Sequence, residues 1–307
     1  MDASADTFAI ELRNLTKFFG SNPAVTEANL TVEQGAFFGF VGPNGSGKST
    51  TIRLMMNYLR PTSGQALLFG KDAVKYSAAI KRDVGFVPSE MDYCLEMKAG
   101  EAIRYAASLR RCKDWDWMRH LCELFELETG RKIRKMSLGN RKKVSLVIAL
   151  MSRPKLLILD EPTVGLDSLV KKRFQDLLRE ENQRGVTVFF CSHDMDEVQS
   201  LCNKVAIIRR GSILEVEDVS ALSAADCRRI SVKTQEDLGP LLELLQAENV
   251  RRMDDSWHFL YRGEINVLVQ ALANYSLEDL QIGRPSLEDA ILRYYGKKME
   301  KEESELG

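Results

Sequence analysis

The sequence predicts an α/β fold with a mainly parallel sheet, an inserted helical subdomain and a small α+β domain at its C-terminal end. Along residues 1–220, short apolar strands alternate with helical segments, as they do when helices cover both faces of a parallel sheet. Residues 89–151 show helical spacing only. Residues 221–307 read strand, helix, strand, strand, helix, strand, which is the order of a ferredoxin-like unit. We therefore expect one domain over 1–220, with its helical subdomain at about 89–151, and an accessory domain over 221–307.

The first part of the α/β domain contains strands that end in turn-rich loops. Residues 8–13 alternate apolar and polar side chains, the pattern of a half-buried strand. Further strands are expected at residues 29–32, 37–41, 65–69 and 84–87. Residues 50–59 have helical spacing, and we expect this helix to stop before Pro61, because proline cannot continue it.

The remaining segments complete both domains. Residues 156–159 are apolar and lie between Pro154 and Pro162, so they are too short for a helix and read as a buried strand. The other expected helices are 99–110, 115–127, 140–151, 170–183, 194–201, 238–247 and 265–273. The other expected strands are 186–191, 204–208, 230–233, 250–253, 257–261 and 277–282. A last helix is expected from Pro285, because Ser286 and Asp289 have the spacing of a capping box.

Composition and charge exclude several classes of protein. Hydrophobic residues make up 44% of the chain and charged residues 28%, which indicates a folded core. The net charge of −1 argues against a protein that coats nucleic acid. The longest nearly unbroken apolar stretch, residues 144–151, is far shorter than the ~20 residues of a membrane span, and residues 1–6 do not resemble a signal peptide. The six cysteines are scattered, so we expect reduced thiols rather than disulfides or a metal site.

A phosphate-binding loop is the first motif that carries chemistry. Gly42 and Gly47 frame four residues, and Lys48 and Ser49 follow directly. Glycines allow successive backbone N–H groups to turn toward phosphates, and the helix that follows adds its positive end. Lys48 can reach the β- and γ-phosphates, and the Ser49 hydroxyl can bind Mg²⁺. The alternative, a glycine-rich turn that binds nothing, fits less well because the motif follows an apolar strand and opens a helix.

Two acids at the end of the strand 156–159 complete this site. Asp160 suits the Mg²⁺ ion, because a carboxylate at the end of a buried strand is costly unless it meets a cation. Glu161 can polarise the attacking water. The alternative is that both acids merely cap the strand. A small GTPase is not expected, because Asn203 and Lys204 lack the acid of the Asn-Lys-x-Asp motif.

From about residue 8 to 214, the chain resembles the nucleotide-binding subunit of an ABC transporter. Ser137 and Gly139 stand in the place of the family's signature sequence, whose Ser and Gly contact the γ-phosphate held by the opposite subunit. By the same resemblance, Phe19 stacks on adenine, Asp167 belongs to the loop that crosses the dimer interface, and His193 touches the γ-phosphate.

We therefore assign three roles to the residues of this site. The residues assigned to nucleotide binding are Phe19, Gly42, Pro43, Asn44, Gly45, Ser46, Gly47, Lys48, Ser49, Thr50, Ser137, Gly139 and Asp167. Catalysis is assigned to Glu161, His193 and Lys48, and Mg²⁺ binding to Ser49, Asp160 and Ser89.

Three residues depart from the family's pattern. Ser89 and then Glu90 follow Pro88 where the family usually has Gln, and Ser is too short to span the same gap, although it could hold a Mg²⁺-bound water. Leu138 replaces the first signature glycine and Asn140 replaces the usual Gln. Leu at this position, and the segment 285–289, resemble the subunits of exporters for drugs, antibiotics, peptides or lipids.

Two further stretches allow more than one interpretation. Seven bases lie within residues 131–143 with no acid among them, which fits steering of a nucleotide-loaded partner, an ordinary solvated helix face or a nucleic-acid patch. Over residues 90–97, the apolar side chains Met91, Tyr93, Leu95 and Met97 are interspersed with the acids Glu90, Asp92 and Glu96. In the family this stretch receives a helix of the membrane subunit, but its apolar groups could also pack inside the helical subdomain.

The resemblance implies an ATPase that uses ATP and Mg²⁺ and powers export through ATP-driven closure of a dimer. Its expected partners are a second ATP-binding subunit, identical or different, and a separate transmembrane permease that holds it on the cytoplasmic face of the cell membrane. No nucleic acid is expected. The alternative is a soluble ABC ATPase that acts on nucleic acid or ribosomes, but the long coiled-coil arms or paired cassettes typical of that class are not apparent. A module that binds ATP without hydrolysis would be expected to lack Glu161 or His193.

Overall fold

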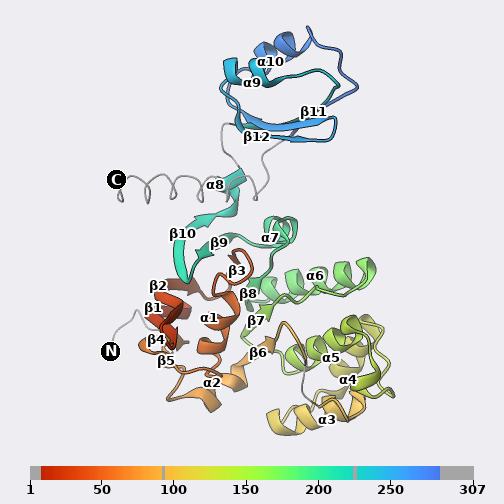
Figure 1. The fold of residues 1–307 in the computed structure, drawn as a ribbon. Helices are drawn as coiled ribbons and strands as arrows, with labels where there is room; N and C mark the ends of the chain where they lie inside the picture. The colour runs from red at the N-terminus through yellow and green to blue at the C-terminus, as the bar shows by residue number, and fades with distance from the viewer. Residues whose placement is uncertain (1–7, 92–93, 224–226, 284–307) are drawn as a thin grey trace. The chain divides into compact units, whose positions relative to one another are not determined.

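The computed structural model describes residues 8–91, 94–223 and 227–283, and the chain forms two compact units, Met1–Glu217 and Asp218–Gly307 (Figure 1). In the described residues, the first unit contains two sheets and the second contains one. Within the described ranges, no helix is long and apolar enough to span a bilayer.

A six-stranded sheet forms the centre of the first unit, and its mainly parallel character confirms the prediction. β3 pairs in parallel with β8 and β9, and β7 pairs in parallel with β6 and β8. Because parallel strands end at the same edge of a sheet, the loops that follow β3, β7 and β8 meet there. In spatial order the strands are β10 (Ser212–Asp218), β9 (Lys204–Arg209), β3 (Phe37–Val41), β8 (Thr187–Cys191), β7 (Leu156–Asp160) and β6 (Val84–Val87).

A second, antiparallel sheet in this unit was not predicted from the sequence. In spatial order its strands are β2 (Asn22–Glu33), β1 (Phe8–Phe19), β4 (Ser63–Leu68) and β5 (Lys71–Asp72). The strands expected at 8–13 and 29–32 are parts of one long hairpin. Register shifts on either side of Leu15 break the alternation of side chains, so the sequence pattern showed only the regular ends of the two strands.

Helix α1 (Lys48–Met55) lies between the two sheets, since it contacts β2 and β4 of one and β7 of the other. One core therefore joins all three layers: Ile10 of the antiparallel sheet, Ile52 of α1 and Ile158 of the parallel sheet belong to the same buried cluster. The other helices of this part of the fold are α2 (Ser77–Asp83), α6 (Ser168–Gln183) and α7 (Met195–Leu201).

The helical subdomain packs on the edge of the parallel sheet at β6. Its elements are α3 (Ala99–Arg110), α4 (Trp115–Leu124), the short 3₁₀ helix η1 (Ile133–Lys135) and α5 (Leu138–Leu150). α3 and α4 both contact α5, and α5 contacts β6. Helix α5 lies very close to β6, because a Cβ at Gly85 of β6 would lie 2.4 Å from the carbonyl oxygen of Ala149 of α5. Helix α5 begins earlier than expected, since Ser137 Oγ caps it by accepting a hydrogen bond from the Asn140 backbone N–H (3.4 Å).

The second unit has the strand order of a ferredoxin-like domain, as the sequence predicts. Its antiparallel sheet runs β12 (Glu248–Met253), β13 (Ser256–Tyr261), β11 (Arg228–Lys233) and β14 (Asp279–Gly283). Its helices are α8 (Val219–Ser223), α9 (Gly239–Leu244) and α10 (Ile265–Leu272). Leu242 and Leu268 of the helices pack with Ile230 and Phe259 of the sheet. The helix expected from Pro285 lies outside the described residues.

Candidate functional site

A cavity of about 400 Å³ lies beside the loop that joins β3 to α1. Segments that follow β3, β6 and β7 all contribute to its wall, so distant parts of the sequence meet there. Its volume is within the usual range for small-molecule sites. The residues on its wall are Pro23, Ala24, Asn44, Gly45, Gly47, Lys48, Ser49, Thr50, Ser89, Asp160 and Glu161. Most of the residues predicted to hold phosphate and Mg²⁺ are therefore brought together.

The loop from Gly42 to Gly47 is packed so tightly that glycine is required at both ends. A Cβ at Gly42 would lie 2.2 Å from the carbonyl oxygen of Ile208 on β9. Gly47 has a φ of 110°, and a Cβ there would lie 2.6 Å from the carbonyl oxygen of Ala24 on β2. The loop is thus held between the two sheets by close contacts at both of its ends.

The buried side chain of Lys48 crosses this loop. Its ammonium group donates hydrogen bonds to the carbonyl oxygens of Gly42 (2.6 Å) and Pro43 (3.1 Å). Lys48, Ser49 and Thr50 form the first turn of α1, and all three border the cavity. The first turn of a helix presents unpaired N–H groups and a partial positive charge, so this wall of the cavity favours an anion.

Asp160, the last residue of β7, supplies a negative charge to the same cavity. The residue is buried, and its Oδ1 atom has no hydrogen-bond partner among the residues that the structure describes. A buried carboxylate oxygen without a partner is costly, so this atom calls for a cation or a donor. The hydroxyl-bearing Ser49 borders the same cavity, and carboxylate and hydroxyl oxygens together suit Mg²⁺.

Glu161 and His193 connect the ends of β7 and β8. His193 Nδ1 lies 2.8 Å from Glu161 Oε2, and the backbone N–H of Glu161 donates to the carbonyl oxygen of Cys191 (2.9 Å). Glu161 has a φ of 48°, in the left-handed region that non-glycine residues rarely occupy. This backbone conformation re-aims the carboxylate just beyond the strand, where it borders the cavity.

Ser137, Gly139 and Asp167 do not border this cavity. They form a separate contact at the start of α5 and α6. A Cβ at Gly139 would lie 2.0 Å from the carbonyl oxygen of Gly165, so the two backbones touch. Lys143 Nζ lies 3.7 Å from Asp167 Oδ2. Asp167 caps α6 by accepting a hydrogen bond from a backbone N–H, and this bond lowers the pKa of its carboxyl group.

Phe19 also lies away from the wall of the cavity. It ends β1 opposite Asn22, its side chain is half exposed, and Lys17 Nζ lies 5.4 Å from the centre of its ring. Pro23 and Ala24, on the other strand of the same hairpin, do border the cavity. The structure therefore places the aromatic residue on the hairpin beside the site, in an exposed position.

Lys142 is a residue of the site that the motifs did not identify. Its buried ammonium group donates hydrogen bonds to the carbonyl oxygens of Pro88 (2.9 Å) and Ser89 (2.6 Å). Burial lowers the pKa of Lys142 to about 8, although the nearby carboxylates of Asp160 and Glu161 act in the opposite direction. The side chain ties α5 to the segment that carries Ser89. The only signal in the sequence was its membership of the basic stretch.

Glu197 is a second residue that sequence reasoning missed. Its buried Oε2 accepts hydrogen bonds from Thr163 Oγ1 (2.9 Å) and Ser192 Oγ (3.1 Å). Its Oε1 lies 2.8 Å from Lys171 Nζ. The carboxylate thus joins the loop after β7, the loop after β8 and helix α6. Acids are common in the first turn of a helix. The sequence alone therefore does not distinguish a buried glutamate that joins two loops from a glutamate exposed to water.

The basic stretch 131–143 is not a uniformly solvated face. Lys142 and Lys143 are buried, and Arg134 forms an ion pair with Glu96. Arg141 donates to backbone carbonyl oxygens. The interpretation as a solvated helix face is therefore wrong for the two lysines. In the apolar stretch 91–97, Met91 is buried within the fold, whereas residues 92–93 lie outside the described residues.

Comparisons with known proteins agree on one family. The family model described as ABC transporter matches residues 25–164. The chain is 35% identical over 209 residues to the bacitracin transport ATP-binding protein BcrA of Bacillus licheniformis. This match covers 67% of this chain and 68% of that protein. It is also 26% identical over 306 residues to the linearmycin resistance ATP-binding protein LnrL of Bacillus subtilis. That match covers 94% of this chain and 98% of that protein.

A solved structure shows the same fold for the first unit. It is the dimeric ATP-binding cassette in a post-hydrolysis state bound to ADP and phosphate, with a TM-score of 0.60 and 24% identity. The match covers 68% of this chain and 98% of that chain.

The contact between Gly139 and Gly165 predicts that Gly139→Ala destabilises the first unit. The added Cβ would meet a backbone oxygen that cannot rotate away, so we expect a loss of about 1–3 kcal/mol and a lower midpoint of thermal unfolding. The control is Gly130→Ala, because a Cβ at Gly130 meets nothing within 4 Å. Equal midpoints for the two variants would contradict the prediction.

The lowered pKa of Lys142 predicts a pH dependence of stability. Unfolded lysine has a pKa near 10.4, so between about pH 8 and 10.4 the unfolded chain binds a proton that the folded protein does not. The cost of burying the charge is fully present below pH 8 and disappears as the pH rises through this window. The unfolding midpoint of the unmodified protein, relative to Lys142→Met, should therefore rise between pH 7.5 and 9.5. A constant difference would show that Lys142 titrates normally.

Proposed function

The chain belongs to the ABC transporter family as an ATP-binding and ATP-hydrolysing subunit, and on that premise we propose that it powers export through a separate membrane-spanning permease. The observation that carries the proposal is that the residues of the site lie on two separate surfaces of the chain. Lys48, Asp160 and Glu161 border the cavity, whereas the signature residue Ser137 lies on a separate surface. The relatives named for bacitracin transport and linearmycin resistance support export. No observation in the described ranges favours the alternative, an ATPase that acts on nucleic acid or ribosomes.

In this proposal the phosphates of ATP occupy the cavity beside α1. The first turn of the helix supplies N–H groups and a partial positive charge, and Lys48 adds a full charge. Transfer of a phosphoryl group to water depends mainly on positioning and on compensation of charge. The loop can provide both, because its backbone is fixed between two sheets at Gly42 and Gly47.

We propose Mg²⁺ as the cation that Asp160 requires. Asp160 and Ser49 would hold the ion, and Ser89 supplies a further hydroxyl oxygen on the same wall. When bound, Mg²⁺ neutralises negative charge on the phosphates. Asp160 is suited to this task because its free oxygen is already buried and oriented by β7.

Glu161 is the residue that we propose as the base for the attacking water. The contact with His193 Nδ1 fixes Oε2 of the carboxylate and leaves Oε1 for the water. His193 is exposed at this end of the sheet, so it can also reach a phosphate oxygen bound in the cavity. His193 thus positions the base, and Glu161 removes the proton.

A second ATP-binding subunit completes each site in this proposal. Ser137 and Gly139 would contact the γ-phosphate held by the partner, which is either a second copy of this chain or a related one. The surface that carries them exposes three apolar side chains, Leu138 (48%), Val164 (37%) and Leu169 (55%). A dimer would remove these groups from water. The permease would hold the dimer at the inner face of the cell membrane.

Glu161→Gln tests the proposed base. The amide keeps the size of the side chain but cannot take a proton, so we expect ATP to bind with similar affinity and steady-state turnover to fall by about 100-fold or more. Phosphate release and equilibrium binding of labelled ATP measure the two effects separately. The matched control is Glu180→Gln on the exposed side of α6, which should keep full turnover. Undiminished hydrolysis by Glu161→Gln would refute the assignment of the base.

The Glu161→Gln protein also tests the dimer. With ATP it should accumulate as a dimer, because closure is no longer reversed by hydrolysis. Adding Ser137→Arg should abolish this dimer, since the bulky cation fills the surface that faces the partner. Adding Ser108→Arg instead, at an exposed position of α3, should not. Light scattering with and without ATP distinguishes the species. An ATP-dependent dimer that persists with Ser137→Arg would remove Ser137 from the interface.

A further inference from the structure

The sheet of the second unit has two faces of different character. Helices α9 and α10 pack on one face of the sheet (Figure 1). Ile230, Trp257 and Phe259 point to that face, because they share a buried core with the helices. Because successive side chains in a strand alternate, Arg229, His258 and Leu260 point to the opposite face. That face is polar and basic in the described residues, and it is hollowed.

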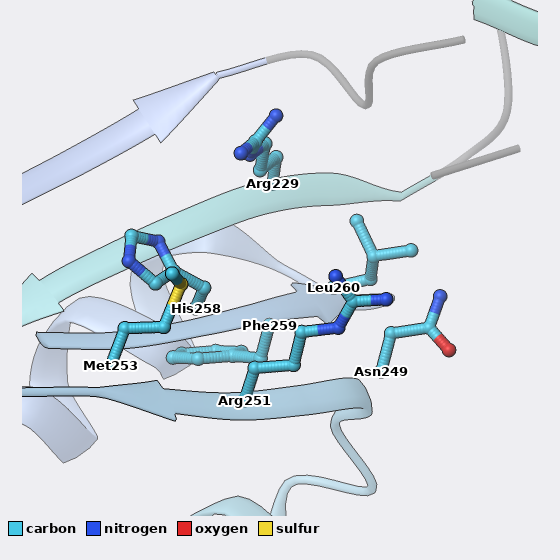
Figure 2. A pocket seen from close by; sticks show the side chains of 7 residues that line it. All are labelled: Arg229, Asn249, Arg251, Met253, His258, Phe259 and Leu260. Carbon is cyan, nitrogen blue, oxygen red and sulfur yellow. The ribbon is translucent and has the colours of Figure 1, made fainter. Parts of the chain in front are cut away.

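A pocket of about 130 Å³ lies on this opposite face (Figure 2). Three neighbouring strands form it: β11 provides Arg229, β13 provides His258 and Leu260, and β12 provides Arg251. The register places Arg229 opposite Leu260 and Arg251 opposite His258, so the two guanidinium groups come from strands on either side of β13. Asn249, Met253 and Phe259 also line the pocket.

Among the described residues, those that line the pocket include two arginines and no acid. Glu248, which the register places opposite Leu260, is engaged by Arg262, with 2.8 Å between Oε1 and Nε. Arg251 forms no ion pair with any residue in the described part of the chain. Arg251 is therefore available to pair with an anion, and the five N–H donors of a guanidinium group allow Arg229 to add a hydrogen bond beside the contacts that it already makes.

His258 adds a second, independent indication. Its Nδ1 atom is buried and has no hydrogen-bond partner among the described residues. Buried polar atoms are almost always paired, so this nitrogen calls for a group that the described residues do not supply. A small rotation of the ring toward a bound anion would give the nitrogen that partner.

The floor of the pocket is apolar, and its volume limits the ligand. Leu260 points to this face and is only 2% exposed, whereas Met253 lines the other end of the pocket, near His258 (Figure 2). The volume is well below the roughly 300 Å³ at which sites for drug-sized ligands begin. A nucleotide is therefore too large.

We infer that this pocket binds a small organic anion, with its carboxylate or phosphate group between Arg229 and Arg251 and a short apolar body over Leu260. The asparagine amide and the imidazole give the site polar contacts that a plain basic surface lacks. The accessory domain would in this way sense a metabolite, at a site distinct from the cavity beside α1.

The chain has only three histidines, which allows a direct test in the whole protein. Histidine labelled at ring carbon Cε1 gives three NMR signals: His258 reports on this pocket, His193 on the nucleotide site and His120 on neither. The probes are malonate and inorganic phosphate, each added to the nucleotide-free protein. We expect the His258 signal to move and saturate with at least one of them, and the more effective probe identifies carboxylate or phosphate as the preferred group.

Two variants decide whether the pocket is responsible. Arg251→Gln should weaken the response of His258 by about ten-fold or more, as expected for the loss of a charge-assisted hydrogen bond. Arg252→Gln is the matched control, because this neighbouring guanidinium lies 5.0 Å from the centre of the Trp257 ring and does not line the pocket. Methyl signals of Ile230 and Leu268, which belong to the core of the second unit, should keep their positions in both variants and so show that this unit is folded.

Three results would overturn the inference. The first is a His258 signal that does not move or does not saturate with either probe. The second is an equal response in Arg251→Gln and the unmodified protein. The third is an equal loss in Arg251→Gln and Arg252→Gln, which would indicate a general effect of charge. Movement of His193 alone would locate anion binding at the nucleotide site and also count against the pocket.

Discussion

The parallel pairing of β3, β8 and β7 is the constraint on which the candidate site depends. Because these strands end at one edge, the loop before α1, the acids after β7 and the histidine after β8 must meet, although they are far apart in the sequence. Two buried side chains of opposite charge, Lys48 and Asp160, lie at this edge of the parallel sheet. Burying either charge alone would cost several kcal/mol, so the sheet edge is stable only if opposite charges or ligands accompany them. The arrangement that serves folding thus also has the charges that the proposed phosphate and cation would require.

A second layer of contacts holds the loops in place beyond the strand ends. Glu161 and His193 contact each other directly, but each belongs to a loop that is also tied by the buried carboxylate of Glu197. Lys171 of α6 compensates the charge of that carboxylate. The two loops therefore share two links, which oppose an independent shift of either loop. Positioning of a nucleophile requires a precision of about 0.5 Å, so links of this kind favour it. Removal of Glu197 would leave Lys171 without its buried partner and would release both loops at once.

The sequence predicted those parts of the fold and site whose signals are local. The strand, glycine loop and helix around Lys48 were recognisable together, and β6 and α3 have the predicted bounds. The antiparallel sheet was missed, because bulges near Leu15 interrupt the alternation that identifies a strand. Lys142 was seen only as one base among seven. The packing of α5 on β6 determines whether this lysine is buried against a carbonyl group or exposed to water. No local sequence pattern predicts that packing.

The contact made by Lys142 helps to explain how Ser89 can stand where the family usually has glutamine. A serine side chain reaches less far than the glutamine usual in the family, so the position of its backbone matters more for any role of its hydroxyl at the cavity. Lys142 holds that backbone through the carbonyl oxygens of Pro88 and Ser89. Because Lys142 lies on the same helix as Ser137 and Gly139, movement of the signature surface would pull directly on the segment that borders the cavity. The short side chain and the buried lysine together form one link between the helical subdomain and the cavity beside α1.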